Sequence, residues 1–328
     1  MKNGTFVISL DFELMWGIRD LEHTSKGDNI IATRDVVPRL LDLFVKYDIH
    51  ATWATVGFLF FESRAEMLSF LPTHQPNYLN ERLSPYKHIL KEVGEDESTD
   101  PLHFAPSLIR QIIATPHQEL ATHTFSHYYC LEDGQTLKDF EADLRVATRL
   151  GEKYDRKIQS IVFPRNQYSN SYLEVCAANG LLTFRGNESI WFRNPSKRKD
   201  HRSWVRRLFR LMDAYINISG TNAYILPSLS DLPVNIPSSR YLRPYSKRLN
   251  FLEPLRLNRI LSSLRKSAQN GHIFHLWWHP EDFSTHIEDN MNILEKILVE
   301  YKNLHEQFGM KSLSMAEVAD TILSGKEH

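Results

Sequence analysis

The fold is decided by the stretch TFVISLDFE, residues Thr5–Glu13, in which a run of apolar residues ends in two acids. The apolar run predicts a β-strand buried in the interior of the protein. Successive side chains of a strand point to opposite faces, so Asp11 and Glu13, two residues apart, point to the same side. We therefore expect both carboxylates to serve one site at the end of this strand.

Beyond this strand, apolar runs alternate with amphipathic helical stretches along most of the chain. Such alternation predicts parallel strands joined by crossover helices, the α/β class. Seven or eight such units predict a barrel, formed by a single domain over residues 1–328. Further strands are expected at 51–57, 119–121, 160–163, 181–184, 232–237 and 273–279, and helices at 33–47, 136–154, 171–179, 258–269, 287–308 and 315–323.

The segment 71–116 interrupts this alternation. It is rich in proline, histidine, asparagine and acidic residues, and it lies between the expected second and third strands. Long loops at the rim of a barrel often carry function. We interpret 71–116 as an insertion within the domain, either a substrate lid or a solvated excursion with one or two helices.

Histidines follow two of the later strands. His123 and His127 stand four residues apart in THTFSH, a spacing that on a helical turn brings two imidazoles to one metal ion. His279 ends the strand of LWWHP, and Pro280 excludes a helical pair of His275 with His279. With fifteen histidines in the chain, such a pair can also arise by chance. The location of these groups at strand ends favours a site, because a barrel gathers those ends at one rim.

These motifs resemble, in their order, those of the polysaccharide deacetylases of carbohydrate esterase family 4, relatives of chitooligosaccharide and peptidoglycan deacetylases. The resemblance runs from about Thr5 to the last helix and implies a distorted (β/α)7-type barrel. The matching segments are Asp11-Phe12-Glu13, Thr122–His127, Phe163-Pro164-Arg165-Asn166 and Leu276–Pro280, and 51–57 resembles the family's second strand.

The resemblance implies that Glu13, His123 and His127 hold a divalent metal, most simply zinc, with cobalt, nickel or manganese as alternatives. The metal would lower the pKa of its bound water towards ~7 and so supply the nucleophile. Asp11 is then the base that takes a proton from this water, and His279 is the acid that protonates the departing amine.

Further roles follow from the same resemblance. Arg165 is expected to pair with Asp11 and keep it ionised. Leu276 is expected to contact the acetyl methyl group, and Trp277 and Pro164 are also expected at the substrate. The chain departs from the family in two ways: a phenylalanine separates its acids, the second of which is a glutamate, and the aspartate that orients the catalytic histidine has no clear match. Candidates for this last role are limited to Asp231.

Composition and charge restrict the binding partners and the cellular location that we expect for the protein. The formal net charge of −1 gives no argument for binding nucleic acid, and two cysteines, Cys130 and Cys176, are too few for a disulfide framework. No secretory or membrane-spanning segment is recognised, which predicts a cytoplasmic protein. The basic stretch 193–210 is either the charged outer face of a barrel helix or a peripheral contact with the inner face of the membrane.

The leading hypothesis is therefore a metal-dependent hydrolase that removes an N-acetyl group from an acetamido sugar. The substrate would be a glycan or lipid-linked sugar in lipopolysaccharide or capsule assembly. One alternative is hydrolysis of a small cyclic amide on the same barrel. Another is a barrel that binds glycan or a membrane partner without catalysis. The sequence does not predict the oligomeric state.

Overall fold

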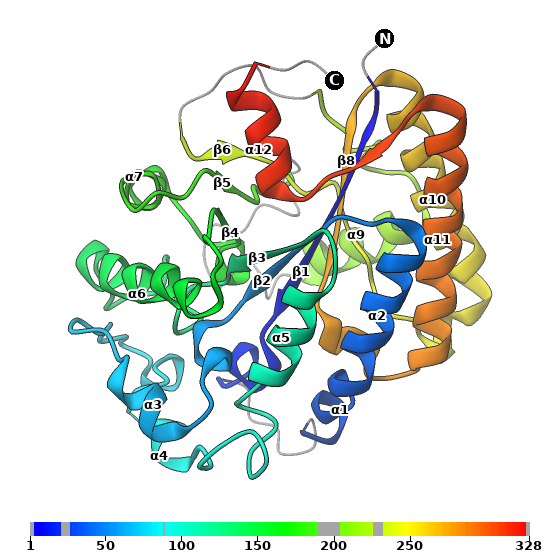
Figure 1. Ribbon diagram of the computed structural model, residues 1–328. Helices are drawn as coiled ribbons and strands as arrows, with labels where there is room; N and C mark the ends of the chain where they lie inside the picture. Colours follow the sequence, from blue (N-terminus) through cyan, green and yellow to red (C-terminus); the bar gives the residue numbers. More distant parts are fainter. Residues whose placement is uncertain (1–2, 21–26, 88, 189–203, 226–231, 326–328) are drawn as a thin grey trace.

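A computed structural model describes residues 3–20, 27–87, 89–188, 204–225 and 232–325 (Figure 1). Its strands form one parallel sheet in the order β6-β5-β4-β3-β2-β1-β8-β7, and β9 pairs with β1. The strands are β1 Thr5–Phe12, β2 Ala51–Thr55, β3 Gln118–Thr122, β4 Ser160–Ile161, β5 Thr183–Phe184, β6 Val234–Asn235, β7 Arg240–Tyr241, β8 Ile273–Trp278 and β9 Lys311–Ser312.

The sheet closes through the segment 234–242, which contains β6 and β7. At one end this segment pairs with β5, and Ser238 donates a backbone hydrogen bond to Gly186. At the other end it pairs with β8, and Ser239 donates to His275. When β6 and β7 are counted together as one interrupted strand, the sheet is a distorted barrel of seven strands, with β9 outside this path. The predicted fold, an α/β barrel of the (β/α)7 type, is confirmed.

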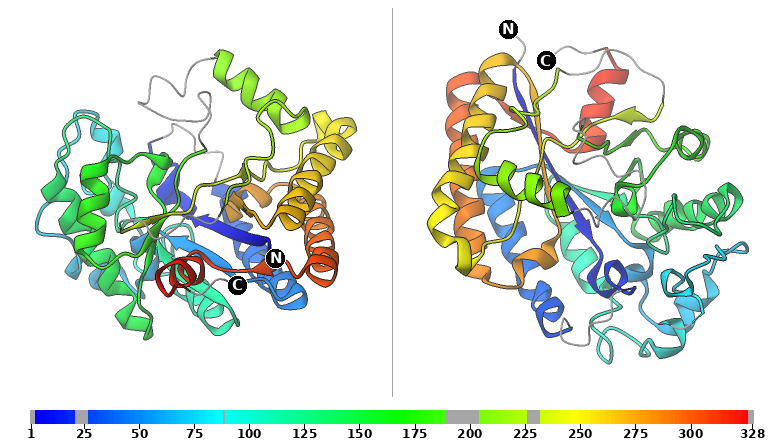
Figure 2. Two further views of the ribbon diagram at one scale, coloured as in Figure 1. Left: turned by 90° about the horizontal axis from the view of Figure 1, so that it is seen from above. Right: turned by 180° about the vertical axis from the view of Figure 1, so that it is seen from behind.

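Helices surround the sheet on its outer side, as the view from above shows (Figure 2). Ile8, Leu10 and Phe12 of β1 pack in the large core between the strands and these helices. The helices are α1 Gly27–Ile31, α2 Thr33–Tyr47, α3 Arg64–Ser69, α4 Ile89–Glu92, α5 Pro106–Ala114, α6 Leu137–Leu150, α7 Asn170–Ala178, α9 Trp204–Tyr215, α10 Glu253–Asn270, α11 Ile287–Phe308 and α12 Met315–Leu323.

The inner face of β1 shows the opposite set of side chains. Val7 joins a small apolar cluster inside the barrel, to which α12 contributes Met315, Val318 and Ile322. Helix α12 therefore closes the end of the barrel where the strands begin, the end at which both chain termini lie in Figure 1. Polar residues occupy the inner face further along β1, where Ser9 and Asp11 are buried.

The segment between β2 and β3 contains α3, α4 and α5, and the predicted insertion 71–116 includes the last two of these helices. Its last helix, α5, packs against both β3 and α2. Residues 106–114 are thus the regular crossover helix of this unit, and the excursion proper ends before them. Among the described residues, no helix combines the length and the apolar character needed to cross a bilayer.

Candidate active site

Polar side chains meet at the rim of the barrel where β1, β3 and β8 end. Asp11 lies near the end of β1 and Glu13 directly follows it. His123 directly follows β3, and His279 directly follows β8. Asp11, Glu13 and His123 are buried, whereas the His279 side chain keeps 30% of its surface exposed. Parallel strands bring their carboxyl ends to one edge, which is why residues so distant in sequence become neighbours.

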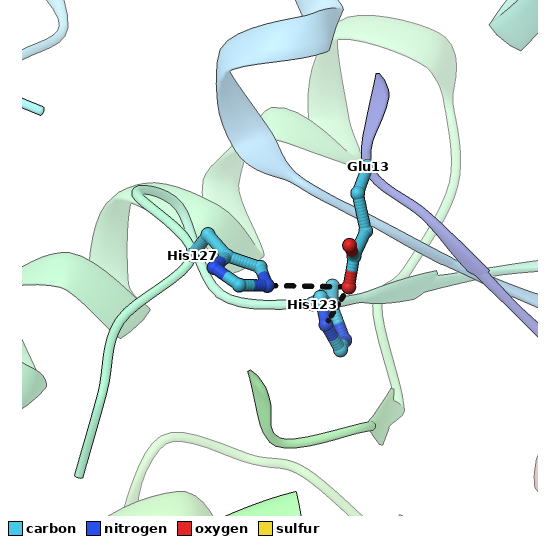
Figure 3. A group of neighbouring side chains, drawn as sticks. All are labelled: Glu13, His123 and His127. Carbon is cyan, nitrogen blue, oxygen red and sulfur yellow. Dashed lines mark hydrogen bonds and ion pairs between the residues drawn. The ribbon is translucent and has the colours of Figure 1, made fainter. Parts of the chain in front are cut away.

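Glu13, His123 and His127 converge on one point (Figure 3). The Oε1 atom of Glu13 lies 2.8 Å from Nε2 of His123 and 3.2 Å from Nε2 of His127. We predicted the histidine pair on a helical turn, and this local structure is wrong. The pair lies on a loop after β3, in which Thr124 and His127 adopt left-handed backbone angles with φ of 63° and 53°.

The histidine loop is held by Asp143 of α6, a residue that sequence reasoning missed. Its carboxylate accepts hydrogen bonds from the backbone N–H groups of Phe125 and Ser126, at 2.7 and 3.1 Å, and from the Ser126 hydroxyl. Burial raises the pKa of Asp143 to about 6, although these hydrogen bonds oppose the rise. Nothing local in the sequence connects an acid in a helix with a loop 17 residues earlier.

The donor set suits a divalent metal. Two imidazole nitrogens and one carboxylate oxygen are the combination that catalytic zinc sites use. Neither ring nitrogen of the buried His123 makes a well-directed hydrogen bond within the described part of the chain. A buried nitrogen without such a partner is costly, and a metal ligand bond would remove that cost.

Arg19 places one condition on this fit. Its guanidinium donates to Nδ1 of His127 at 3.0 Å and to the carbonyl oxygen of His127 at the same distance. An arginine is always a donor, so Nδ1 must accept and the proton of the neutral ring sits on Nε2, facing Glu13. Metal binding through Nε2 therefore requires this proton to move to Nδ1 and the Arg19 hydrogen bond to that atom to break.

Asp11 pairs with Arg185, not with Arg165. Two nitrogens of Arg185 lie 2.7 Å from the two carboxylate oxygens of Asp11, and both side chains are buried. Burial raises the pKa of Asp11, but Arg185, His123 and His279 together lower it by a larger amount. The pKa of Asp11 therefore lies below its ordinary value. Arg185 directly follows β5, and this position at a strand end was the signal that could have revealed it.

Arg165 lies elsewhere at this rim, so the predicted pairing with Asp11 is wrong. Its guanidinium contacts Asp20 at 2.6 Å and Glu132 at 3.4 Å, and it lies over the ring of Tyr129. The short helix η6, Pro164–Asn166, turns Arg165 with a left-handed φ of 55°. Because η6 begins beyond the end of β4, the side chain of Arg165 points towards Asp20 and Glu132 and not towards Asp11.

His279 is oriented by Asp282, which lies in the short helix η8, Pro280–Phe283. Nδ1 of His279 lies 3.0 Å from Asp282, while Nε2 lies 3.8 Å from Asp11 and 3.7 Å from Glu13. Burial lowers the pKa of His279, but the three carboxylates outweigh burial and hold it well above its ordinary value. Asp231, the expected orienting residue, lies outside the described residues.

Glu281 is a further, partly buried acid of the site that sequence reasoning missed. Its Oε1 atom accepts hydrogen bonds from the backbone N–H groups of Glu13 and Leu14, at 3.0 and 2.6 Å. Burial and the charge of Glu13 raise the pKa of Glu281 to about 7. Its contacts fix the backbone that presents the Glu13 carboxylate.

The expected substrate contacts have different locations. Leu276 is fully buried in the core between strands and helices, so its expected contact with an acetyl group is wrong. The reason is the alternation of β8, which turns Leu276 outward and Trp277 inward. Trp277 lies beside the site, with Arg185 over its ring at 4.1 Å and His279 at 5.8 Å between ring centroids. Pro164 is buried at the start of η6, and its role in substrate binding stays a prediction.

A protein-family model matches part of the chain. Residues 25–184 match the model of the family described as polysaccharide deacetylase. The matched range contains both histidines of the β3 loop, whereas Asp11 and Glu13 precede it and His279 follows it. No protein of curated function shows significant sequence similarity to the chain.

Several solved structures share the fold. A protein from Mycobacterium smegmatis, provisionally named polysaccharide deacetylase, has a TM-score of 0.63 at 12% identity, over 100% of this chain and 93% of the other. A similarly named protein from Pseudomonas aeruginosa PAO1 has 0.54 at 11%, over 99% and 92%. The PuuE allantoinase has 0.55 at 12%, over 99% and 91%. At these identities the likeness establishes the fold alone.

Proposed function

We propose, from the premise that residues 25–184 of this chain are of the polysaccharide deacetylase family, that the protein removes N-acetyl groups from an acetamido sugar. Members of this family are hydrolases that act on amide carbon–nitrogen bonds. The observation that carries the proposal is the convergence of Glu13, His123 and His127 beside Asp11 and His279. The substrate we propose is a glycan or a lipid-linked sugar of cell-surface polysaccharide assembly.

Amide hydrolysis needs an activated water and a protonated leaving group. A divalent ion held by Glu13, His123 and His127, zinc in our proposal, would polarise the acetyl carbonyl and acidify a water molecule. Asp11, kept ionised by Arg185, accepts the proton that the attacking water loses. His279, whose pKa is held high by Asp282, Glu13 and Asp11, donates a proton to the departing amine.

Acetate release tests this proposal directly. Purified protein supplied with zinc or cobalt should release acetate from N-acetylated oligosaccharides, and Asp11→Asn should reduce the rate by about 1,000-fold. The variant should keep its metal, because Asp11 is not a proposed ligand. Asp133→Asn, which changes an exposed acid, is the matched control and should retain full activity. Equal rates for Asp11→Asn and the wild type would overturn the proposal.

The same assay separates the alternatives. The PuuE allantoinase shares the fold, so a panel of ring amides belongs beside the sugars. If the protein hydrolyses a ring amide and none of the sugars, its substrate would be a small cyclic amide and not an acetamido sugar. A purified protein without bound divalent metal and without turnover would instead support a binding role.

We further propose that the protein acts at the inner face of the membrane through α9 and the basic stretch before it. Within α9, Trp204, Leu208 and Met212 follow one another at four-residue intervals and are 73%, 45% and 39% exposed. Residues 193–203 of the predicted contact lie outside the described residues. In a flotation assay the protein should rise with anionic liposomes. The double substitution Trp204→Ala and Leu208→Ala should reduce the fraction of protein that floats with them. Equal recovery without anionic lipid would contradict this proposal.

A further inference from the structure

A second group of metal-ligand side chains lies at the opposite end of the barrel, where β2 and β3 begin. One ligand atom from each of Asp48, His50 and His117 lies within 4.8 Å of the others. The register of the two strands pairs Ala51 with Gln118, which places the preceding residues, His50 and His117, side by side. Their rings stack in parallel with centroids 4.1 Å apart.

The contacts around this group prepare it for a cation. Nδ1 of His50 lies 2.7 to 2.8 Å from the carboxylate oxygens of Glu317, so a neutral His50 donates there and keeps its lone pair on Nε2. A carboxylate behind a histidine is the usual outer partner of a metal-ligating imidazole. Asp48 lies 3.8 Å from Nε2 of His117 and adds a negatively charged oxygen.

The site would connect three parts of the fold. Asp48 directly follows α2 as its C-cap, while His50 and His117 precede β2 and β3. Glu317 belongs to α12 and also accepts the backbone N–H of Ser314 at the start of that helix. Helix α12 closes this end of the barrel, at the top of Figure 1.

We propose that Asp48, His50 and His117 bind a divalent transition metal of the zinc class, separate from the metal of the active site. Two imidazoles and one carboxylate, with water completing the shell, match the ligands that zinc accepts. The His117 and Asp48 side chains are 50% and 74% exposed, so the ion exchanges with solvent. Its role is structural: it ties the starts of β2 and β3 to the helix that closes the barrel.

The test uses the full chain with the active site disabled by His123→Ala and His127→Ala. After equilibrium dialysis against zinc, this protein should retain about one equivalent and should melt at a higher temperature with zinc than with chelator. Adding His117→Ala should remove both effects. Asp48→Asn, which suits the left-handed backbone there, should weaken zinc binding by about 10-fold without unfolding the protein.

The control in the same background is His74→Ala, which removes an exposed histidine outside this cluster and should change neither reading. Absence of zinc from the protein with the disabled active site would overturn the proposal, as would zinc binding that survives His117→Ala. Because His123 and His127 are already removed, failure here leaves the proposed hydrolase untouched. Loss of the deacetylase activity would equally leave this site untouched.

Discussion

Strand β3 is flanked by a histidine at each end, and the two histidines differ in their exposure to solvent and in their neighbours. His117 precedes the strand and is half exposed, beside Asp48 and His50. His123 follows the strand and is buried beside Glu13 and His127. Both ends therefore hold two imidazoles and a carboxylate. The buried end adds the pairs of Asp11 with Arg185 and of His279 with Asp282, whereas the exposed end adds Glu317 beside His50.

The difference follows from the cost of burying charge. An unpaired charge in the interior loses several kcal/mol of solvation, whereas at the surface water supplies most of it. The buried end accordingly pairs Asp11 with Arg185 and His279 with Asp282. The exposed end needs no comparable pairing for Asp48. This contrast supports our proposals of catalysis at the first end and of cation binding at the second.

Among substitutions of the residues that support the two sites, the largest expected effect comes from removing the counter-charge of the buried base. Arg185→Met leaves Asp11 buried without a cation, so the pKa of Asp11 should rise and the acid limb of the kcat/KM profile should move to higher pH. We expect a loss of about 100-fold or more at neutral pH, in line with a broken buried ion pair. Arg165→Met is the matched control, and an equal shift in that variant would contradict the assignment of Arg185.

A smaller effect is expected from the residue that orients the acid. Asp282→Asn removes a carboxylate that raises the pKa of His279, so that pKa should fall towards its ordinary value. His279 donates only when protonated, so the alkaline limb of the profile should move to lower pH. At a pH of about 8 the rate should drop by about 30-fold, within the range for general acid catalysis. An unchanged alkaline limb would exclude this role for Asp282.

Arg19 should affect metal affinity more modestly. Arg19→Met removes the donor to Nδ1 of His127 and frees that nitrogen to carry the proton that a ligated ring requires. The zinc dissociation constant of the active site, measured by chelator competition, should fall by about 10-fold. Arg165→Met removes a second cation over Tyr129 without touching His127. Equal tightening in both variants would assign the effect to net charge.

The smallest effect is expected at the exposed end of the barrel. Glu317→Gln keeps a hydrogen-bond acceptor for His50 but removes the charge behind it. Zinc affinity there should weaken by a few-fold, less than the ~10-fold typical for partners of buried ligands. A zinc titration of the protein that lacks His123 and His127 measures this affinity. A loss as large as that of His117→Ala would mean that Glu317 is itself a ligand.

Much of the fold could be predicted because it depends on local patterns. The helices at 33–47 and 287–308 were predicted with the bounds that the structure has. Of the segment 234–242, β6 lies within the strand expected at 232–237, whereas β7 was not predicted, because a strand of two residues leaves no periodic pattern. The helical turn for His123 and His127 was wrong because Asp143, distant in sequence, holds that loop in another conformation.

The sequence by itself determined which residue types reach the rim of the barrel. The apolar run of Thr5–Glu13 and its two final acids require a buried strand with carboxylates at its end, and this depends only on the two-residue period of a strand. Only the tertiary structure decided the partners: Arg185 rather than Arg165 for Asp11, and Asp282 for His279. Which side chains become partners depends on the distances and directions between strand ends. These are set only when the strands pair in register, so they cannot be read from the sequence.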